Sequence, residues 1–162
     1  MRKHTEALDV EVLIEPGRFI VGNAGILVTE VQYVKRGKAK TFVIVDAAMN
    51  DLVRPTLYDA YHEIKPVDER PAGADLEKVD VVGPVCESGD YLARDRNLPV
   101  ARPGELLAVF SAGAYGAVQS GTYNSRLLVP EVLVDGDRWA VVRPRPSYDD
   151  LIGLDHVPDW LI

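Results

Sequence analysis

Short apolar runs alternate along the chain with glycine, proline and charged residues, a pattern typical of β-strands joined by turns. Two β-rich runs surround Gly37 within residues 26–48 and predict a hairpin. A second hairpin is predicted within residues 126–144, because Asp135–Gly136 is a strong signal for a tight turn between two strands. Further strands are predicted at residues 78–86 and 104–113.

Residues 50–62 carry the one clear helical pattern in this part of the chain. The segment begins with polar residues, has Pro55 near its start, and spaces Leu52, Leu57 and Tyr61 roughly as a helix requires. The body of the chain, about 26–146, is therefore predicted to be mostly antiparallel β with one or two short helices, as a sandwich or barrel.

The first 25 residues do not fit this body well. Residues 9–18, DVEVLIEPGR, form a short apolar run that stops at Pro16 and Gly17, which predicts a buried strand ending in a turn. A buried strand with nothing before it to pair with suggests the last piece of another unit.

Composition narrows the class of protein. The 162 residues are 47% hydrophobic and 27% charged, with a formal net charge of −7, as expected of a globular domain. The densest basic stretch, Lys35 to Lys40, lies at a predicted turn, so a nucleic-acid partner is not expected. A single cysteine excludes an internal disulfide framework, and no apolar run reaches the length of a membrane span. We expect a cytoplasmic protein with no membrane partner.

Four short motifs carry possible chemistry. They are EPGR at 15–18, RPTLY at 54–58, GPVCESGD at 83–90 and AGAYG at 112–116. Each also has a plain structural interpretation: a turn with a solvated ion pair, surface decoration of a helix, a small buried thiol beside a surface acid, or tight packing of small residues. His4, His62 and His156 have no ligand-like spacing, so no metal site is expected.

The four motifs in this order resemble the C-terminal half of the diaminopimelate decarboxylase family of pyridoxal-phosphate enzymes. The resemblance runs from about Asp9 to Leu161 and includes TYNSR at 122–126. It is sharpest at Cys86–Glu87, because related ornithine-type decarboxylases usually follow the cysteine with aspartate. It implies decarboxylation of meso-2,6-diaminopimelate to L-lysine and carbon dioxide, the last step of lysine biosynthesis.

The family fold is a (β/α)₈ barrel followed by a β-domain. The resemblance thus implies that residues 1–25 are the truncated end of the cofactor-binding barrel, and that residues 26–162 are the C-terminal β-domain with short helices. The lysine that bonds to the cofactor and the glycine-rich phosphate loop lie in the barrel part, which this sequence lacks. The chain is therefore expected to be a fragment that is inactive alone.

The resemblance also assigns the cofactor, pyridoxal 5′-phosphate. Glu15 matches the carboxylate beside the ring nitrogen, where a negative charge favours the protonated ring. Arg18 matches the residue that meets the cofactor and substrate anions, and Tyr115 the residue that contacts the cofactor phosphate. Pro16 and Gly17 complete the cofactor-binding set.

The substrate's distal end is a zwitterion, with one ammonium and one carboxylate. By resemblance, Glu87 binds the ammonium, whereas the distal carboxylate is met by Arg18, Arg54 and Tyr58, with Tyr115 as a further substrate contact. Cys86 matches the residue that returns a proton to the carbon from which carbon dioxide departs. In the family, the Cys-Glu turn enters the active site of the partner subunit, so a homodimer with shared sites is expected.

Two alternatives stay open. The chain could be a free-standing β-domain that acts as a binding or assembly module, although such a module has no evident use for Glu15, Arg18, Cys86, Glu87 and Tyr115 together. It could also belong to a pyridoxal-phosphate decarboxylase of another diamino acid. The combination of Glu87 with Arg54 argues against that second alternative.

Overall fold

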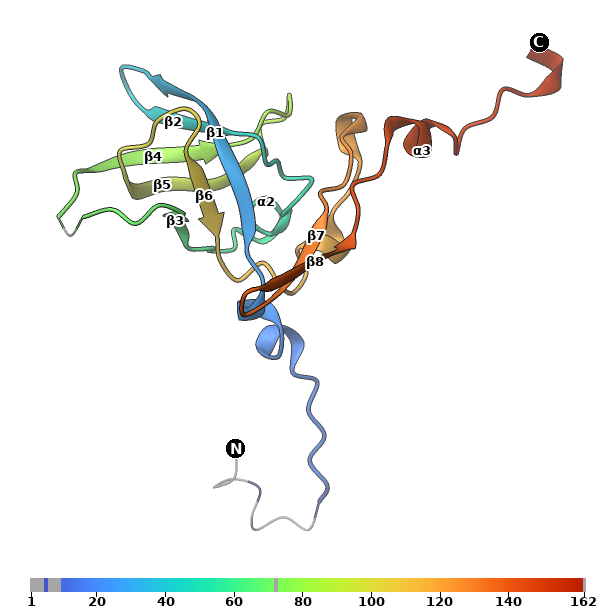
Figure 1. Ribbon diagram of the computed structural model, residues 1–162, viewed down its shortest axis with the longest axis horizontal. Coiled ribbons are helices and arrows are strands. Elements are labelled where there is room, and N and C mark those ends of the chain that lie inside the picture. Colours follow the sequence, from blue (N-terminus) through green and yellow to red (C-terminus); the bar gives the residue numbers. More distant parts are fainter. Residues whose placement is uncertain (1–4, 6–9, 72, 162) are drawn as a thin grey trace.

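The computed structural model describes residue 5, residues 10–71 and residues 73–161, and shows a mostly β protein (Figure 1). Six strands form one sheet in the order β3-β6-β1-β2-β4-β5. Their bounds are β1 Leu27–Arg36, β2 Thr41–Val45, β3 Ile64–Pro66, β4 Leu76–Val82, β5 Tyr91–Pro99 and β6 Leu106–Val109. The predicted fold class is confirmed.

The sheet is antiparallel except between β2 and β4, which run parallel. It curls until its two edges, β3 and β5, nearly meet. Arg96 on β5 donates from its guanidinium to the backbone oxygen of His62, just before β3, at 2.9 Å. The hairpin predicted around Gly37 is the β1–β2 pair, and the strands predicted at 78–86 and 104–113 are β4 and β6.

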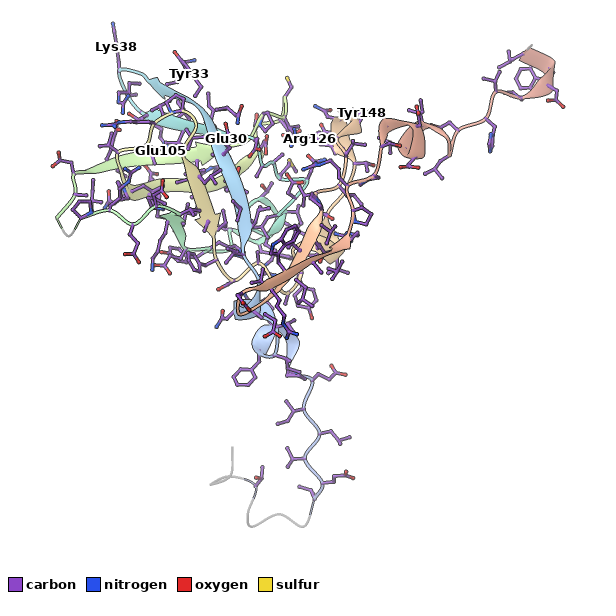
Figure 2. All side chains as sticks on the ribbon, viewed as in Figure 1. Glu30, Tyr33, Lys38, Glu105, Arg126 and Tyr148 are labelled. Carbon is purple, nitrogen blue, oxygen red and sulfur yellow. The ribbon has the colours of Figure 1, made fainter. Side chains whose placement is uncertain are left out.

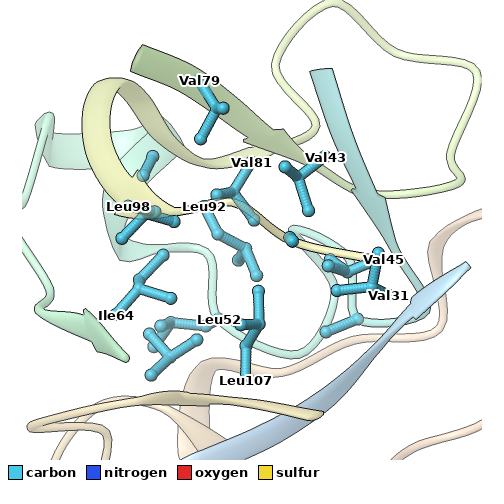
Figure 3. Close-up of a cluster of buried hydrophobic side chains, with 14 residues drawn as sticks. Val31, Val43, Val45, Leu52, Ile64, Val79, Val81, Leu92, Leu98 and Leu107 are labelled. Atoms are coloured by element: carbon cyan, nitrogen blue, oxygen red, sulfur yellow. The ribbon is translucent and has the colours of Figure 1, made fainter. Parts of the chain in front are cut away.

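The inside of this curled sheet is the core (Figure 3). It is built mainly of β-branched and leucine side chains, which pack well on a pleated surface. Leu52, from the segment that precedes helix α2 (Arg54–Tyr58), reaches the same core. The members labelled in Figure 3 are Val31, Val43, Val45, Leu52, Ile64, Val79, Val81, Leu92, Leu98 and Leu107.

The predicted helix at 50–62 is present but covers only Arg54–Tyr58. It stops because Asp59 adopts a left-handed conformation, with φ 51°, and ends the helical hydrogen-bonding pattern. Pro55 lies in the first turn, where its missing N–H costs no helical hydrogen bond.

The strand predicted at 9–18 is wrong for the described part of that range. Residues 10–16 have no regular secondary structure and are exposed, and Gly17–Phe19 form a short 3₁₀ turn, η1. The segment runs away from the sheet in Figure 1. An apolar run becomes a strand only beside another strand that supplies hydrogen bonds, and no described segment lies there.

The second predicted hairpin is confirmed as β7 (Glu131–Asp135) and β8 (Arg138–Arg143), which form a separate two-stranded sheet. Most of its apolar side chains are exposed to solvent, and Figure 2 shows the chain after the hairpin extending away from the six-stranded sheet. Trp139 is 70% exposed, and Trp160 in the last turn, η5 (Asp159–Leu161), is 82% exposed.

Helix α3 (Tyr148–Ile152) lies between the hairpin and η5. Ser147 caps its N-terminus in a reciprocal capping box with Asp150. Those hydrogen bonds lower the pKa of Asp150. Within the described ranges, no helix combines the length and apolar character needed to cross a bilayer.

Candidate active site

The Cys86 turn, residues 83–90, joins β4 to β5. The backbone folds back twice within it, since Glu87 N donates to Val85 O at 2.8 Å and Asp90 N donates to Glu87 O at 3.0 Å. The Cys86 side chain is exposed, and the Glu87 carboxylate accepts a hydrogen bond from Gly89 N at 3.2 Å. The sharp turn expected around the thiol is therefore present, with both side chains at the surface.

Helix α2 packs directly on this turn. Thr56 Oγ1 donates a hydrogen bond to Gly89 O, and Tyr91 Oη donates to Pro55 O at 3.2 Å. On the helix itself, the Arg54 guanidinium lies over the Tyr58 ring, 5.6 Å from its centre, so the two share one face as their spacing predicts. The structure thus brings the segments that carry Arg54, Tyr58, Cys86 and Glu87 together.

A second group forms where two segments cross. The 21–25 backbone lies against residues 111–113, with Gly113 N donating to Gly22 O at 3.0 Å and Ala112 N donating to Gly25 O at 2.9 Å. A Cβ on Gly113 would overlap the backbone oxygen of Val21, so only glycine fits at this crossing. The crossing holds the segment after Arg18 beside the turn that carries Tyr115.

Tyr115 adopts a left-handed backbone conformation, with φ 59°, and its side chain is half-exposed. Arg18 is exposed in η1. Glu15 lies in the exposed segment before η1, and within the described part of the chain no hydrogen bond or ion pair joins it to another candidate residue. Pro16 O accepts from Phe19 N at 3.1 Å, and Gly17 has φ 56°, so these two shape the turn that presents Arg18.

His62 connects the two groups electrostatically. Its side chain is only 1% exposed, and its Nδ1 lies 2.9 Å from Phe110 O, so Nδ1 carries the proton and donates. Burial lowers the pKa of His62, and the charges of Arg54, Arg18 and Arg96 lower it further, whereas the Phe110 hydrogen bond raises it. Arg18 and Arg54 therefore both act on this one buried ring.

Two buried polar atoms at this place have no hydrogen-bond partner among the described residues: His62 Nε2 and Arg54 Nε. With Nδ1 protonated, His62 Nε2 is an acceptor, so the unpaired donor of the two is Arg54 Nε. Buried polar atoms are usually satisfied, and an unpaired guanidinium N–H suits an anion such as a phosphate or a carboxylate.

We expect the stability of the chain to fall as pH drops below about 6.5. The unfolded chain protonates its histidine there, whereas folded His62 stays neutral because its pKa is lowered. The unfolded state then binds more protons, at a cost of up to about 1.4 kcal/mol per pH unit until the folded pKa is reached. Urea unfolding at several pH values measures this slope.

His62→Asn should remove that part of the slope, because asparagine can still donate to Phe110 O but does not titrate. His156→Gln is the control, since His156 is exposed. Buried Asp51, whose pKa is raised by burial, is present in all three proteins and cancels from the comparison. An identical slope in His62→Asn and in the unsubstituted chain would contradict this account.

Sequence reasoning missed the importance of His62, which it considered only as a metal ligand. It also gave no role to Asp90 and Thr56, which organise the Cys86 turn. A buried histidine between a tyrosine and a glutamate leaves little sequence signal, because only the fold shows that its side chain, in the segment before β3, is covered. Among the described residues, no three His, Cys, Asp or Glu side chains gather to hold a metal ion.

Comparison with known sequences decides the family. Residues 18–113 match the sequence model of the C-terminal sheet domain of pyridoxal-dependent decarboxylases. The chain belongs to this decarboxylase family. The matched range runs from Arg18 to the Gly113 crossing, and it contains the whole six-stranded sheet, α2 and the Cys86 turn.

Individual relatives of this decarboxylase sheet domain agree with that result. A diaminopimelate decarboxylase of Zymomonas mobilis subsp. mobilis is 47% identical over 161 residues, and one of Archaeoglobus fulgidus is 50% identical over 161 residues. Both matches cover 99% of this chain. A solved diaminopimelate decarboxylase from M. jannaschii, in complex with L-lysine, is 37% identical over 99% of the chain, with a TM-score of 0.87.

This decarboxylase chain spans only part of those proteins. It corresponds to 38% of the length of each of the two curated relatives and to 36% of the M. jannaschii chain.

Proposed function

We propose that this chain is the C-terminal part of a meso-diaminopimelate decarboxylase, which releases carbon dioxide from meso-2,6-diaminopimelate and forms L-lysine. The observation that carries the proposal is the 47–50% identity to diaminopimelate decarboxylases along 99% of the chain. The structure agrees with it in placing Arg54 and Tyr58 on one face of α2 and in exposing Cys86 and Glu87 on a sharp turn.

Pyridoxal phosphate, an anion, would be bound by Arg18 and Tyr115, whose chain segments are joined at the Gly113 crossing. When bound, it supplies the electron sink that decarboxylation needs. Arg18 would meet its anionic groups with a forked guanidinium, Tyr115 would offer one hydroxyl to the phosphate, and Glu15 would favour the protonated ring nitrogen. Pro16 and Gly17 present Arg18 through the η1 turn.

The distal end of the substrate would lie between α2 of one subunit and the Cys86 turn that the other subunit contributes. Glu87 is exposed and would accept from the distal ammonium, while Arg54 and Tyr58, on one face of α2, would hold the distal carboxylate. A substrate without a distal carboxylate leaves these donors unpaired, and such a mismatch costs binding energy.

The thiol of Cys86 would give its proton to the carbon atom that has lost carbon dioxide. A thiol suits this role because thiols can give and regain a proton near neutral pH. Cys86 is exposed at the tip of a turn, which is the placement expected of a group that acts on a substrate held elsewhere.

We further propose that two copies of the whole enzyme share their sites, with the Cys86 turn of one subunit completing the site of the other. The exposed apolar residues of the β7–β8 hairpin and of residues 148–161 support such contacts, because surfaces of this kind are typical of interfaces. A single cysteine is consistent with work in the cytoplasm.

The test is a full-length enzyme in which this chain follows the barrel part of a diaminopimelate decarboxylase. Carbon dioxide release is measured with meso-diaminopimelate, ornithine and arginine at equal concentrations. The proposal requires turnover of diaminopimelate well above that of the other two. A preference for ornithine or arginine would instead support a related decarboxylase, and no turnover of any amino acid would leave the domain as a binding module.

The 162-residue chain alone is expected to form no stoichiometric covalent adduct with pyridoxal phosphate. Its lysines at 35, 38, 40, 65 and 78 are exposed, and none lies in a motif of a cofactor-binding lysine. Borohydride reduction followed by mass spectrometry should show only low, scattered labelling of these amines. A single site labelled to completion, together with turnover of diaminopimelate, would contradict this expectation.

A further inference from the structure

Asp90 ends the Cys86 turn and is buried, at 5% exposure. Its two carboxylate oxygens have different partners. Oδ2 accepts from Val85 N at 2.6 Å, which lies inside the turn, and Oδ1 accepts from Met49 N at 2.7 Å, which lies in another loop. Within the ranges that the structure describes, no ion pair joins Asp90 to a cationic side chain, so backbone amides alone compensate for its burial.

Gly83, at the other end of the turn, lies directly against the Asp90 carboxylate. Gly83 N donates to Asp90 O at 3.1 Å, and a Cβ on Gly83 would come within 2.5 Å of both carboxylate oxygens. Only a residue without a side chain leaves room for Asp90 here. The first and last residues of the GPVCESGD motif therefore form one closed unit around Cys86 and Glu87.

Met49 belongs to the loop at 46–52, which leads into α2. The same loop reaches the segment after Tyr115, because Asn50 Nδ2 donates to Gly121 O at 3.0 Å and to Tyr123 O at 2.8 Å. The loop also holds Asp51, which lies 3.8 Å from the Arg126 guanidinium. Figure 2 labels Arg126 near the end of the sheet. A single loop thus joins the Cys86 turn, helix α2 and the segment that follows Tyr115.

We propose that Asp90 is a positioning residue, which clamps the Cys86–Glu87 turn to the loop that leads into α2. It thereby fixes the position from which the sheet domain presents Cys86 and Glu87. The catalytic consequence rests on the proposed function, whereas the clamp itself does not. Thr56 bonds α2 to Gly89 of the turn, and Tyr91, at the start of β5, bonds to Pro55 of α2. Among the described residues, only Asp90 bonds both the turn and the loop with one side chain.

The first test uses the chain itself and follows amide hydrogen exchange by NMR. Asp90→Asn keeps the shape of the side chain but can no longer accept from both amides. The exchange rates of the Met49 and Val85 amides should rise by a factor at least ten times larger than the factor for Val43 and Val81, in the centre of the sheet. Asp137→Asn, at the exposed tip of the β7–β8 hairpin, is the matched control and should change neither set.

A second variant, Gly83→Ala, should loosen the same two amides because its Cβ displaces the carboxylate. If Asp90 only stabilises the fold as a whole, exchange at the Val43 and Val81 amides will become faster by the same factor as at Met49 and Val85. That outcome overturns the clamp, as does unchanged exchange at Met49 and Val85 in folded Asp90→Asn.

The second test uses the full-length enzyme described above. Asp90→Asn should lower kcat and raise KM for diaminopimelate, with kcat/KM reduced tenfold or more and the absorbance of the bound cofactor unchanged. Kinetics equal to those of Asp137→Asn would overturn the positioning role. An unsubstituted enzyme without activity would overturn the proposed function, and the exchange experiment would still decide whether the clamp exists.

Discussion

Replacing Cys86 by alanine in the full-length enzyme is expected to lower kcat by about 10²–10⁴-fold while KM changes little. The substitution removes one proton donor and leaves the side chains that bind the substrate in place. Cys86 is exposed and none of the described residues depends on its side chain for a hydrogen bond, so the fold should tolerate the change. Steady-state kinetics with meso-diaminopimelate measure both parameters.

Glu87→Ala, one residue later, should act mainly on recognition. It removes the anion that would face the distal ammonium, a charge-assisted contact worth roughly 1.5–3 kcal/mol, which corresponds to about a 10–200-fold loss in kcat/KM through a higher KM. Ser88→Ala, in the same turn and also exposed, is the control for general disturbance. The same decrease in kcat and the same increase in KM in Cys86→Ala and Glu87→Ala would contradict separate roles in proton transfer and recognition.

Gly113→Ala is expected to destabilise the chain strongly, by about 1–3 kcal/mol or more. The new methyl group would overlap the Val21 oxygen and push the 21–25 segment away. The backbone hydrogen bonds of Gly113 to Gly22 and of Ala112 to Gly25 would then lengthen or break. Urea unfolding followed by circular dichroism measures the loss.

Gly121→Ala is the matched control, because nothing lies within 4 Å of the position that its Cβ would take and its φ is not in the left-handed region. If Gly113→Ala is as stable as Gly121→Ala, the 21–25 segment must move aside without cost. In the full-length enzyme, Gly113→Ala should also weaken binding of the cofactor, since the crossing holds the segment after Arg18 beside the Tyr115 turn.

Both hairpins could be predicted from sequence because their signals are local. Gly37 and Asp135–Gly136 lie between apolar runs, and the structure has tight turns at both places. The parallel pairing of β2 with β4 has no such signal, because it depends on the path that residues 46–75 take between the two strands. Sequence patterns therefore predict where strands occur better than they predict which strands pair with one another.

Strand β5 was not predicted, for a physical reason that its residues show. Its middle is charged, at Arg94, Asp95 and Arg96, and only Leu92, Ala93 and Leu98 are buried. Asp95 interrupts the strand with φ 49°, and its amide donates to the buried Asp80 carboxylate at 2.7 Å. An irregular strand with a kink lacks the alternation that identifies regular ones.

The motif residues of the candidate site could be predicted from the sequence, but the contacts that arrange them could not. The spacing of Arg54 and Tyr58 correctly placed them on one helix face, and the Cys86–Glu87 turn is as sharp as its glycines suggested. The contributions of His62 and Asp90 depend on burial and on contacts with Phe110 and Met49, which are far from them in sequence. Such contacts become visible only in the fold.

The central place of β1 in the sheet determines when the site can assemble. On one side β1 pairs with β2, its neighbour in sequence, but on the other it pairs with β6, joining Leu27 to Val109. Closing so long a loop is entropically unfavourable and belongs to folds of high contact order, which form slowly. We expect the loop at 46–52 to meet the segment after Tyr115 only after that pairing has formed. During synthesis, the site therefore stays unformed until β6 has left the ribosome.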